Sequence, residues 1–247
     1  MFPIQDSIPR RCPPLMTWAI MAICIAVFFV EISLPPPMLE KLFYLFGVVP
    51  ARYTHPDWAA SVGLVPKAIL PLFTCMFLHG SWVHIVGNMW TLWIFGDNVE
   101  DEMGPLRYLL FYLFCGIVAS LVQIYTNPHS TIPTIGASGA IAGVMGAYYM
   151  LFPGARIIIM VPILFFPFFF DVPAVFFLAF WFLEQVFSGT FSLLSPQQAG
   201  GIAWWAHAGG FLCGMLSYRF FLHKSVCSRL FPDQMRPWGL LNSRERF

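Results

Sequence analysis

The fold is decided by the stretch at residues 136–146, which reads Gly-Ala-Ser-Gly-Ala-Ile-Ala-Gly-Val-Met-Gly. Its glycines recur every three or four residues within an apolar run, a spacing that lets two helices approach closely inside a membrane. A second pair at the same kind of spacing, Gly210 and Gly214, lies in a later apolar segment. We therefore expect these two segments to be helices in direct contact.

Composition places most of the chain in lipid. Of 247 residues, 58% are apolar, only 10% are charged and 27 are Phe, against roughly 45–50% apolar and 25% charged in soluble domains. Mean hydropathy is +0.72. The balance of 13 basic and 12 acidic residues excludes a nucleic-acid binder, which needs a basic face. The six cysteines form no C-x-x-C pair, so we expect neither a metal nor another cofactor.

A helix needs about 20 mainly apolar residues to cross the hydrocarbon core. On this criterion we predict an all-α membrane protein, one domain over residues 1–247, with six transmembrane helices. Arg10 and Arg11 precede the first helix and prolines follow it without a cleavage site, as in an uncleaved signal anchor. Prolines also interrupt residues 157–173, which we expect to be a membrane-hugging loop. The predicted helices are 15–33, 78–96, 107–125, 136–152, 173–188 and 201–221, with a first loop at 34–77 and a cytoplasmic tail at 222–247.

Basic residues predict the orientation. With both termini cytoplasmic, ten of the 13 Lys and Arg residues lie inside and only Lys41, Arg52 and Lys67 lie outside, as the positive-inside rule requires. The loop at 34–77 is rich in aromatic side chains. We expect it to lie in the outer membrane interface as short amphipathic helices.

Strongly polar side chains inside spans are costly, so each is a candidate functional residue. At 1.5 Å per residue, four of the predicted helices carry such residues at one depth, about 10 Å below the outer surface on this topology. The polar residues of the spans are His79, His84, Asn88, Ser138, Glu184, Gln185 and His207.

The chemistry of this layer indicates acyl transfer. Gly136 and Gly139 flank Ser138 and leave its backbone N–H exposed, as an oxyanion site needs. A serine hydroxyl needs a base to become a nucleophile, and His207 is the histidine of the last helix. Gly210 shares the helix face of His207, which permits close contact with the serine helix.

Two other side chains complete the layer. His84 and Asn88 lie four residues apart on one helix face, where both can donate hydrogen bonds to a developing oxyanion. Packing alone is the competing interpretation, because Gly and Ser are common at membrane helix contacts. Glu184 and Asp171 would suit a transporter, but transporters more often carry internal repeats, and none is evident. The conjunction of nucleophile, base and donors favours an enzyme.

At these residues the sequence resembles the rhomboid family of intramembrane serine proteases, over roughly residues 16–221. The motifs that carry the resemblance are His79, His84-x-x-x-Asn88, Gly96, Glu100, Gly104-Pro-Leu-Arg107, Tyr112, Gly136-Ala137-Ser138-Gly139, Trp181-x-x-x-Gln185, Ala206-His207-Ala208-Gly209-Gly210 and Gly214.

The resemblance implies a six-helix bundle with a pocket open to the outer face and a Ser138–His207 dyad that requires no carboxylate. It implies an oxyanion hole formed by the Ser138 N–H, His84 and Asn88. The reaction it implies is cleavage of transmembrane protein substrates in or beside their membrane segments, through an acyl-enzyme and without a cofactor. The alternative is a non-catalytic rhomboid-like factor that binds membrane proteins. We expect a bacterial inner membrane as the location.

The supporting residues are expected to be structural: His79 as a hydrogen-bonding scaffold, Glu100 near Arg107, and the glycines Gly136, Gly139, Gly210 and Gly214. Two positions depart from patterns found in some rhomboids. The first loop has Arg52 without a preceding Trp, and Ala142 stands where a Tyr can stack on the catalytic His. Another ring, or none, then supports His207. A triad in which Glu184 orients His207 stays open as an alternative.

Overall fold

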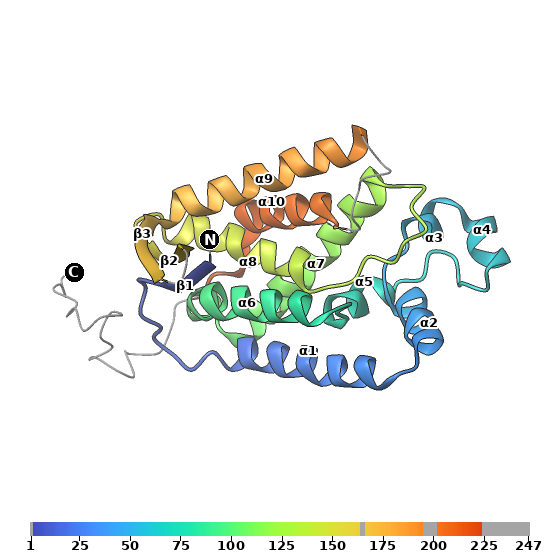
Figure 1. The fold of residues 1–247 in the computed structure, drawn as a ribbon, viewed down its shortest axis with the longest axis horizontal. Helices are drawn as coiled ribbons and strands as arrows, with labels where there is room; N and C mark the ends of the chain where they lie inside the picture. The colour runs from blue at the N-terminus through green and yellow to red at the C-terminus, as the bar shows by residue number, and fades with distance from the viewer. Residues whose placement is uncertain (1, 164–165, 195–201, 224–247) are drawn as a thin grey trace.

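The computed structural model describes residues 2–163, 166–194 and 202–223. It is a helical bundle with short helices at one end and a small sheet at the other (Figure 1). In the described residues, three helices are long and apolar enough to cross a membrane: α1, α7 and α9. Long helices occupy each of the six predicted segments. They are α1 (Leu15–Ser33), α6 (Trp82–Met103), α7 (Pro105–Thr126), α8 (Ser138–Leu151), α9 (Ala174–Leu194) and α10 (Trp204–Phe221).

The predicted bounds were wrong for α6, which begins at 82 and ends at 103 instead of spanning 78–96. Ser81 caps its start, because the Ser81 Oγ accepts the backbone N–H of His84 at 3.2 Å. The helix continues through an acidic turn and stops at Gly104, which has a positive φ of 74°. Charged residues end a membrane span but need not end a helix. Pro105 then opens α7.

The other bounds differ less. Helix α9 extends six residues past the predicted end at 188, and α8 begins at Ser138 instead of 136. The predicted start of the last helix, residue 201, and most of the predicted tail, 224–247, lie outside the described residues.

Helices α8 and α10 are in direct contact, as the glycine spacing predicts. A Cβ at Gly210 would overlap the carbonyl oxygen of Gly139, and one at Gly214 would overlap that of Gly143. The backbones therefore touch where larger residues would hold them apart. Residues 139–148 of α8 are all buried, so α8 is the central helix of the bundle.

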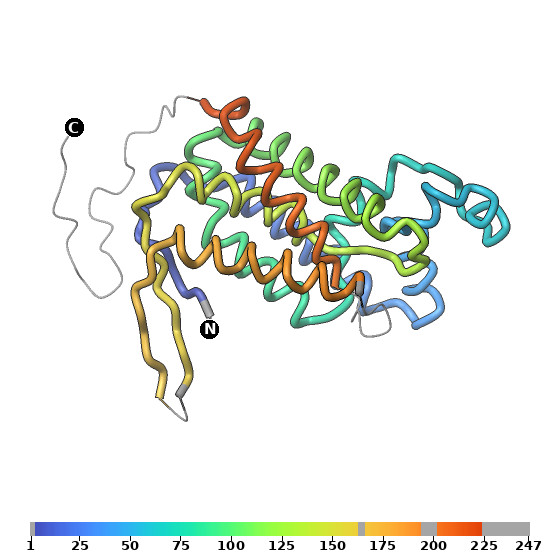
Figure 2. Tube along the Cα trace, turned by 90° about the horizontal axis from the view of Figure 1, so that it is seen from above, coloured from blue at the N-terminus to red at the C-terminus, as the bar shows by residue number. Residues whose placement is uncertain are grey.

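The protein is mainly helical, as expected, but it is not all-α, and residues expected to form an irregular loop at 157–173 form strands. Strands β1 (Phe2–Asp6), β2 (Arg156–Ile163) and β3 (Phe166–Pro173) form an antiparallel sheet in the order β1-β2-β3. The prolines that exclude a helix here are tolerated in a short hairpin, where Pro162 stands opposite Pro167. Figure 2 shows this hairpin projecting from the bundle.

The first loop contains short helices, as predicted: α2 (Pro36–Phe46), α3 (Pro50–Thr54), α4 (Pro56–Ser61), α5 (Pro71–Thr74) and the 3₁₀ turn η1 (Cys75–Phe77). The first loop also forms backbone hydrogen bonds with residues 134–136, which lead into α8. Val48 and Thr134 exchange backbone hydrogen bonds of 3.0 and 2.7 Å, and the Gly136 N–H donates to the Cys75 carbonyl at 2.8 Å. Arg52 is buried and donates to the Leu45 carbonyl at 3.2 Å.

Candidate active site

Ser138 and His207, predicted on separate helices, lie in contact. The Ser138 Oγ is 2.7 Å from the His207 Nε2. Ser138 is the first residue of α8, and His207 lies in the first turn of α10. Both side chains are part-buried. The glycine contacts between α8 and α10 bring the two backbones near enough for this hydrogen bond to form.

A residue of α9 holds the other nitrogen of His207. The Gln185 Oε1 lies 2.7 Å from the His207 Nδ1. Because an amide oxygen can only accept, the Nδ1 carries the proton, and the Nε2 is free to accept the Ser138 hydroxyl. The sequence did not predict this contact. It indicated Gln185 only as a polar residue of a span and as part of a family motif.

Glu184, the candidate third member of a triad, bonds to its neighbours on α9. Its carboxylate accepts hydrogen bonds from the Gln185 amide nitrogen and from the Ser188 Oγ at 3.0 Å. The structure thus gives Gln185 the contact with His207 and gives Glu184 the contact with Gln185.

Two tryptophan rings flank His207. The Trp181 centroid lies 6.1 Å from that of the imidazole with planes 33° apart, and the Trp204 centroid lies 6.4 Å away, edge-on. They come from α9 and α10. Ring support is therefore present although position 142 is Ala.

Donors gather beside the serine. Gly136 has a φ of 123°, and a Cβ there would lie 2.5 Å from the His84 Nε2 and 3.7 Å from the Asn88 Nδ2. Only glycine fits this position. Ser138 begins α8, so its N–H has no acceptor in the helix. The buried Asn88 Nδ2 has no hydrogen-bond partner in the described residues.

The residues expected to act as a scaffold contact other elements. Neither ring nitrogen of His79 has a hydrogen-bond partner in the described residues, so the expected hydrogen bonding is made by its backbone and not by its side chain. The His79 ring packs 5.1 Å from that of His84, and its backbone N–H donates to the buried carboxylate of Glu31, at 3.1 and 3.2 Å to the two oxygens. Glu31 was missed, because a carboxylate at the end of an apolar window looks like a span boundary.

Glu100 supports α1 and is not tied to Arg107. Its carboxylate accepts the Met16 N–H at 2.9 Å, the Thr17 N–H at 2.7 Å and the Thr17 hydroxyl at 2.8 Å. It therefore caps the first turn of α1, where backbone N–H groups lack helical acceptors. Arg107 instead donates to the Leu222 carbonyl at 2.5 Å.

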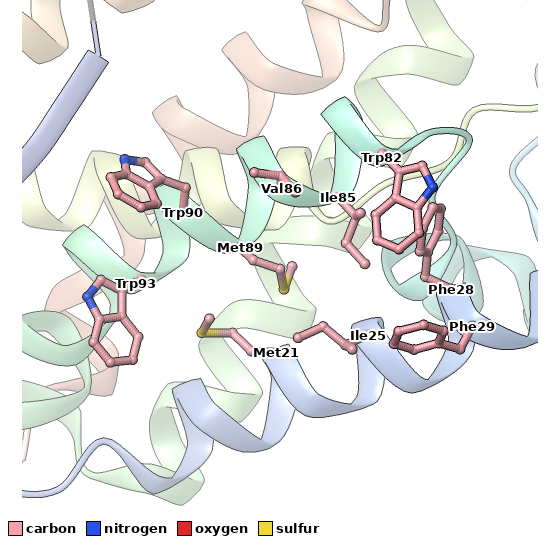
Figure 3. Close-up of a pocket in the computed structure, with 10 residues that line it drawn as sticks. All are labelled: Met21, Ile25, Phe28, Phe29, Trp82, Ile85, Val86, Met89, Trp90 and Trp93. Carbon is pink, nitrogen blue, oxygen red and sulfur yellow. The ribbon is translucent and has the colours of Figure 1, made fainter. Parts of the chain in front are cut away.

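A separate groove of about 420 Å³ lies between α1 and α6, where Met21 and Ile25 of α1 face Met89 and Ile85 of α6 (Figure 3). It holds no titratable or nucleophilic side chain, so it cannot perform the chemistry for which the dyad is suited. The groove is lined by Met21, Ile25, Phe28, Phe29, Trp82, Ile85, Val86, Met89, Trp90 and Trp93.

In the described residues, no three His, Cys, Asp or Glu side chains gather as a metal site would need.

Comparison with known proteins agrees with the family resemblance seen in the sequence. Residues 66–224 match the family model described as the Rhomboid domain. Rhomboid protein 1, mitochondrial, of Saccharomyces cerevisiae is 30% identical over 154 residues, which are 61% of this chain and 41% of that protein. Rhomboid protease GluP of Bacillus subtilis is 41% identical over 76 residues, 31% of this chain and 14% of that protein.

A plant protein, Rhomboid-like protein 11, chloroplastic, of Arabidopsis thaliana, is 41% identical over 70 residues, 28% of this chain and 25% of that protein. The chain thus spans less than half the length of each of these three relatives.

Proposed function

Because this chain belongs to the rhomboid family, we propose that it is a serine endopeptidase that cleaves other membrane proteins in or beside their transmembrane segments. Family membership and the apolar helices make it an integral membrane protein, related to intramembrane proteases and rhomboid-like proteins. The observation that carries the proposal is the 2.7 Å contact between the Ser138 Oγ and the His207 Nε2.

In the proposed reaction, the Ser138 Oγ attacks the carbonyl carbon of the scissile bond while the His207 Nε2 takes its proton. The carbonyl electrons move to the oxygen and form a tetrahedral oxyanion. When the intermediate collapses, the C–N bond breaks and the protonated His207 gives its proton to the leaving amine. The acyl group stays on Ser138. Water then attacks the acyl carbon while His207 takes its proton. The bond between that carbon and the Ser138 Oγ breaks, His207 returns the proton to the Oγ, and the product with the new carboxyl group leaves.

The oxyanion is the species that most needs stabilisation, because a full charge appears where the substrate carried none. The Ser138 N–H, the His84 side chain and the Asn88 amide are the proposed donors. Preorganised donors of this kind stabilise the transition state without further rearrangement. The orphan amide nitrogen of Asn88 supports this role.

The transporter alternative needs Glu184 and Asp171 to act together, and each of them has other partners. Asp171 lies in the hairpin and pairs with Arg156 at 3.5 Å, while Glu184 lies in α9 among hydrogen-bond donors. Two carboxylates engaged on separate elements do not form a shared ion site.

The proposed topology has six spanning helices and both termini in the cytoplasm, from the distribution of Lys and Arg. Transmembrane proteins are the proposed substrates, and a bacterial inner membrane is the proposed location. Cysteine labelling from each side of sealed vesicles, at single cysteines placed in the first loop and the hairpin, tests the orientation. Labelling of both from the same side would contradict it.

The test of activity is labelling of the detergent-purified protein by a fluorescent fluorophosphonate. We expect wild type to be labelled and the Ser138→Ala and His207→Ala variants to stay unlabelled, because the probe needs an activated serine. If folded wild type is not labelled while a control serine hydrolase is, the protein is a non-catalytic membrane-protein binding factor and the proposal is wrong. Cleavage of a labelled transmembrane substrate in vesicles then tests the reaction.

A further inference from the structure

A continuous series of hydrogen bonds leads from Ser138 through His207 and Gln185 to Glu184. It runs from the Ser138 Oγ to the His207 Nε2, then from the His207 Nδ1 to the Gln185 Oε1, both at 2.7 Å. It continues from the Gln185 amide nitrogen to the Glu184 carboxylate, which also accepts the Ser188 Oγ. The Gln185 side chain is only 3% exposed, so water does not compete for its amide.

We infer that Gln185 is a positioning residue for the proposed protease, holding His207 in the tautomer that can accept the serine proton, and that Glu184 sets the orientation of the Gln185 amide. This inference rests on the proposed function. The two nitrogens of a neutral imidazole share one proton, so an acceptor at the Nδ1 places the proton there and leaves the Nε2 as a base.

An amide can point either end at the histidine, and only one end is useful. If the Gln185 NH₂ faced His207, the imidazole would carry its proton on the Nε2 and could not accept from Ser138. The Glu184 carboxylate prevents this because it can only accept hydrogen bonds. It draws the amide nitrogen toward itself and so leaves the oxygen for His207.

The arrangement also differs from a carboxylate triad in charge. The group against the imidazole is neutral, and the carboxylate stands one hydrogen bond further away and is part-buried. The amide dipole therefore links the charge to the imidazole, which becomes positive during the reaction. Both ends of the Gln185 amide are paired, as a buried amide requires, and their order places the amide oxygen on the imidazole.

Four variants and one control test the inference, with the fluorophosphonate as the probe. Gln185→Met keeps the size and removes the acceptor. Glu184→Gln keeps the size and removes the group that orients the amide. Gln185→Glu and the exchanged pair Glu184→Gln/Gln185→Glu complete a double-mutant cycle. Thr190→Val is the matched control, since Thr190 lies on the same helix, is exposed and donates to the Val186 carbonyl oxygen of its own helix at 2.8 Å.

The readouts are kinact and KI of the probe, because the first reports on the dyad and the second on binding. In Gln185→Met we expect kinact to fall by about 30-fold with KI within about twofold, from the loss of a hydrogen bond to a group that becomes charged. Glu184→Gln should lower kinact by about five- to tenfold. Thr190→Val should match wild type in both.

The exchanged pair is the decisive variant. It restores an acceptor at 185 and a donor at 184, so kinact should return to within about threefold of wild type. Gln185→Glu alone places two carboxylates side by side and should label more slowly than the exchanged pair. A merely structural role would not produce this recovery. Melting temperature and monodispersity in detergent show which variants fold, and if Gln185→Met does not fold, the three other variants still decide.

The inference is overturned if folded Gln185→Met keeps kinact within twofold of wild type, or if the exchanged pair is no faster than its slower single variant. Either result with wild type labelled and Ser138→Ala unlabelled leaves the proposed protease intact and removes only the role of Gln185. An unlabelled wild type overturns both proposals, and it is recognised because no variant then differs from Ser138→Ala.

Discussion

Asn88 combines burial with an unused donor. An unsatisfied buried amide costs about 1–3 kcal/mol, and such groups are uncommon in native proteins. The Asn88 Nδ2 lies near Gly136, beside the nucleophile. A donor that has no partner in the described residues and lies near Gly136, two residues from the serine, is suited to an oxyanion that exists only during the reaction.

We therefore expect Asn88→Ala to lower the rate at which Ser138 is acylated by about 10²- to 10³-fold with little loss of stability, because its amide nitrogen bonds to nothing in the described residues. Fluorophosphonate kinact and the melting temperature in detergent measure the two effects. The matched control is Asn98→Ala, whose amide donates to Asp6 at 2.9 Å. It should lose stability and keep its labelling rate. Equal losses of activity in the two variants would contradict the oxyanion role.

The sequence was enough to predict that Ser138 and His207 pair. It was not enough to predict that Gln185, and not Glu184, contacts His207. Depth along a helix follows from counting residues, so the polar layer was predictable. Adjacent residues of a helix point about 100° apart, and which of them faces His207 depends on the rotation of α9. That helix is apolar on nearly all sides, so its periodicity does not specify the rotation.

At the scale of elements, the contact between α8 and α10 places the dyad. The carbonyl oxygens of Gly139 and Gly143 occupy the space that side chains at 210 and 214 would need. Without a hydrophobic driving force between helices in lipid, such close backbone packing supplies much of their association. The same contact sets the distance between Ser138 and His207.

Gly210→Ala should therefore separate the two helices, destabilise the protein by about 1–3 kcal/mol and abolish labelling of Ser138. Gly87→Ala is the control, since Gly87 is an exposed helical glycine with no atom within 4 Å of the added Cβ. Alanine there should be neutral or slightly stabilising. Thermal unfolding in detergent gives the comparison. A melting temperature for Gly210→Ala equal to that of Gly87→Ala would show that the close α8–α10 contact does not determine the stability of the protein.

The hairpin shows which element the sequence could not specify. A half-buried strand alternates apolar and polar residues, but β3 is apolar over most of its length and exposed from Phe166 to Asp171. Prolines correctly excluded a helix there without indicating what replaced it. The strand β1 carries no stronger signal, because its pairing with β2 joins segments more than 150 residues apart.

At the scale of the whole molecule, the two ends of the bundle are built differently. The first loop lies at one end, while the sheet meets the ends of α6 and α8 at the other (Figure 1). Asp6 is a buried carboxylate of that second junction. It accepts the Tyr148 hydroxyl at 2.5 Å and the Asn98 amide at 2.9 Å. Burial raises the pKa of Asp6 from 3.8 to about 7, against the opposing effect of the hydrogen bond from Tyr148.

This raised pKa makes the junction weaken as pH rises. Between about pH 4 and pH 7 the folded protein holds a proton on Asp6 that the unfolded chain has lost, so the free energy of unfolding falls with increasing pH across that window. Above pH 7 the ionised carboxylate is buried and the full penalty applies. Asparagine keeps an acceptor for both partners and cannot ionise.

Asp6→Asn should therefore melt about 2–4 °C higher than wild type at pH 8 and show a smaller gain, or none, at pH 5. Melting curves of both proteins in one detergent, at both pH values, give the comparison. Asp57→Asn, at an exposed position of α4, is the control and should shift the melting temperature equally at both. If the difference between Asp6→Asn and wild type is the same at pH 5 and pH 8, Asp6 does not titrate in this range and is not a source of pH-dependent stability.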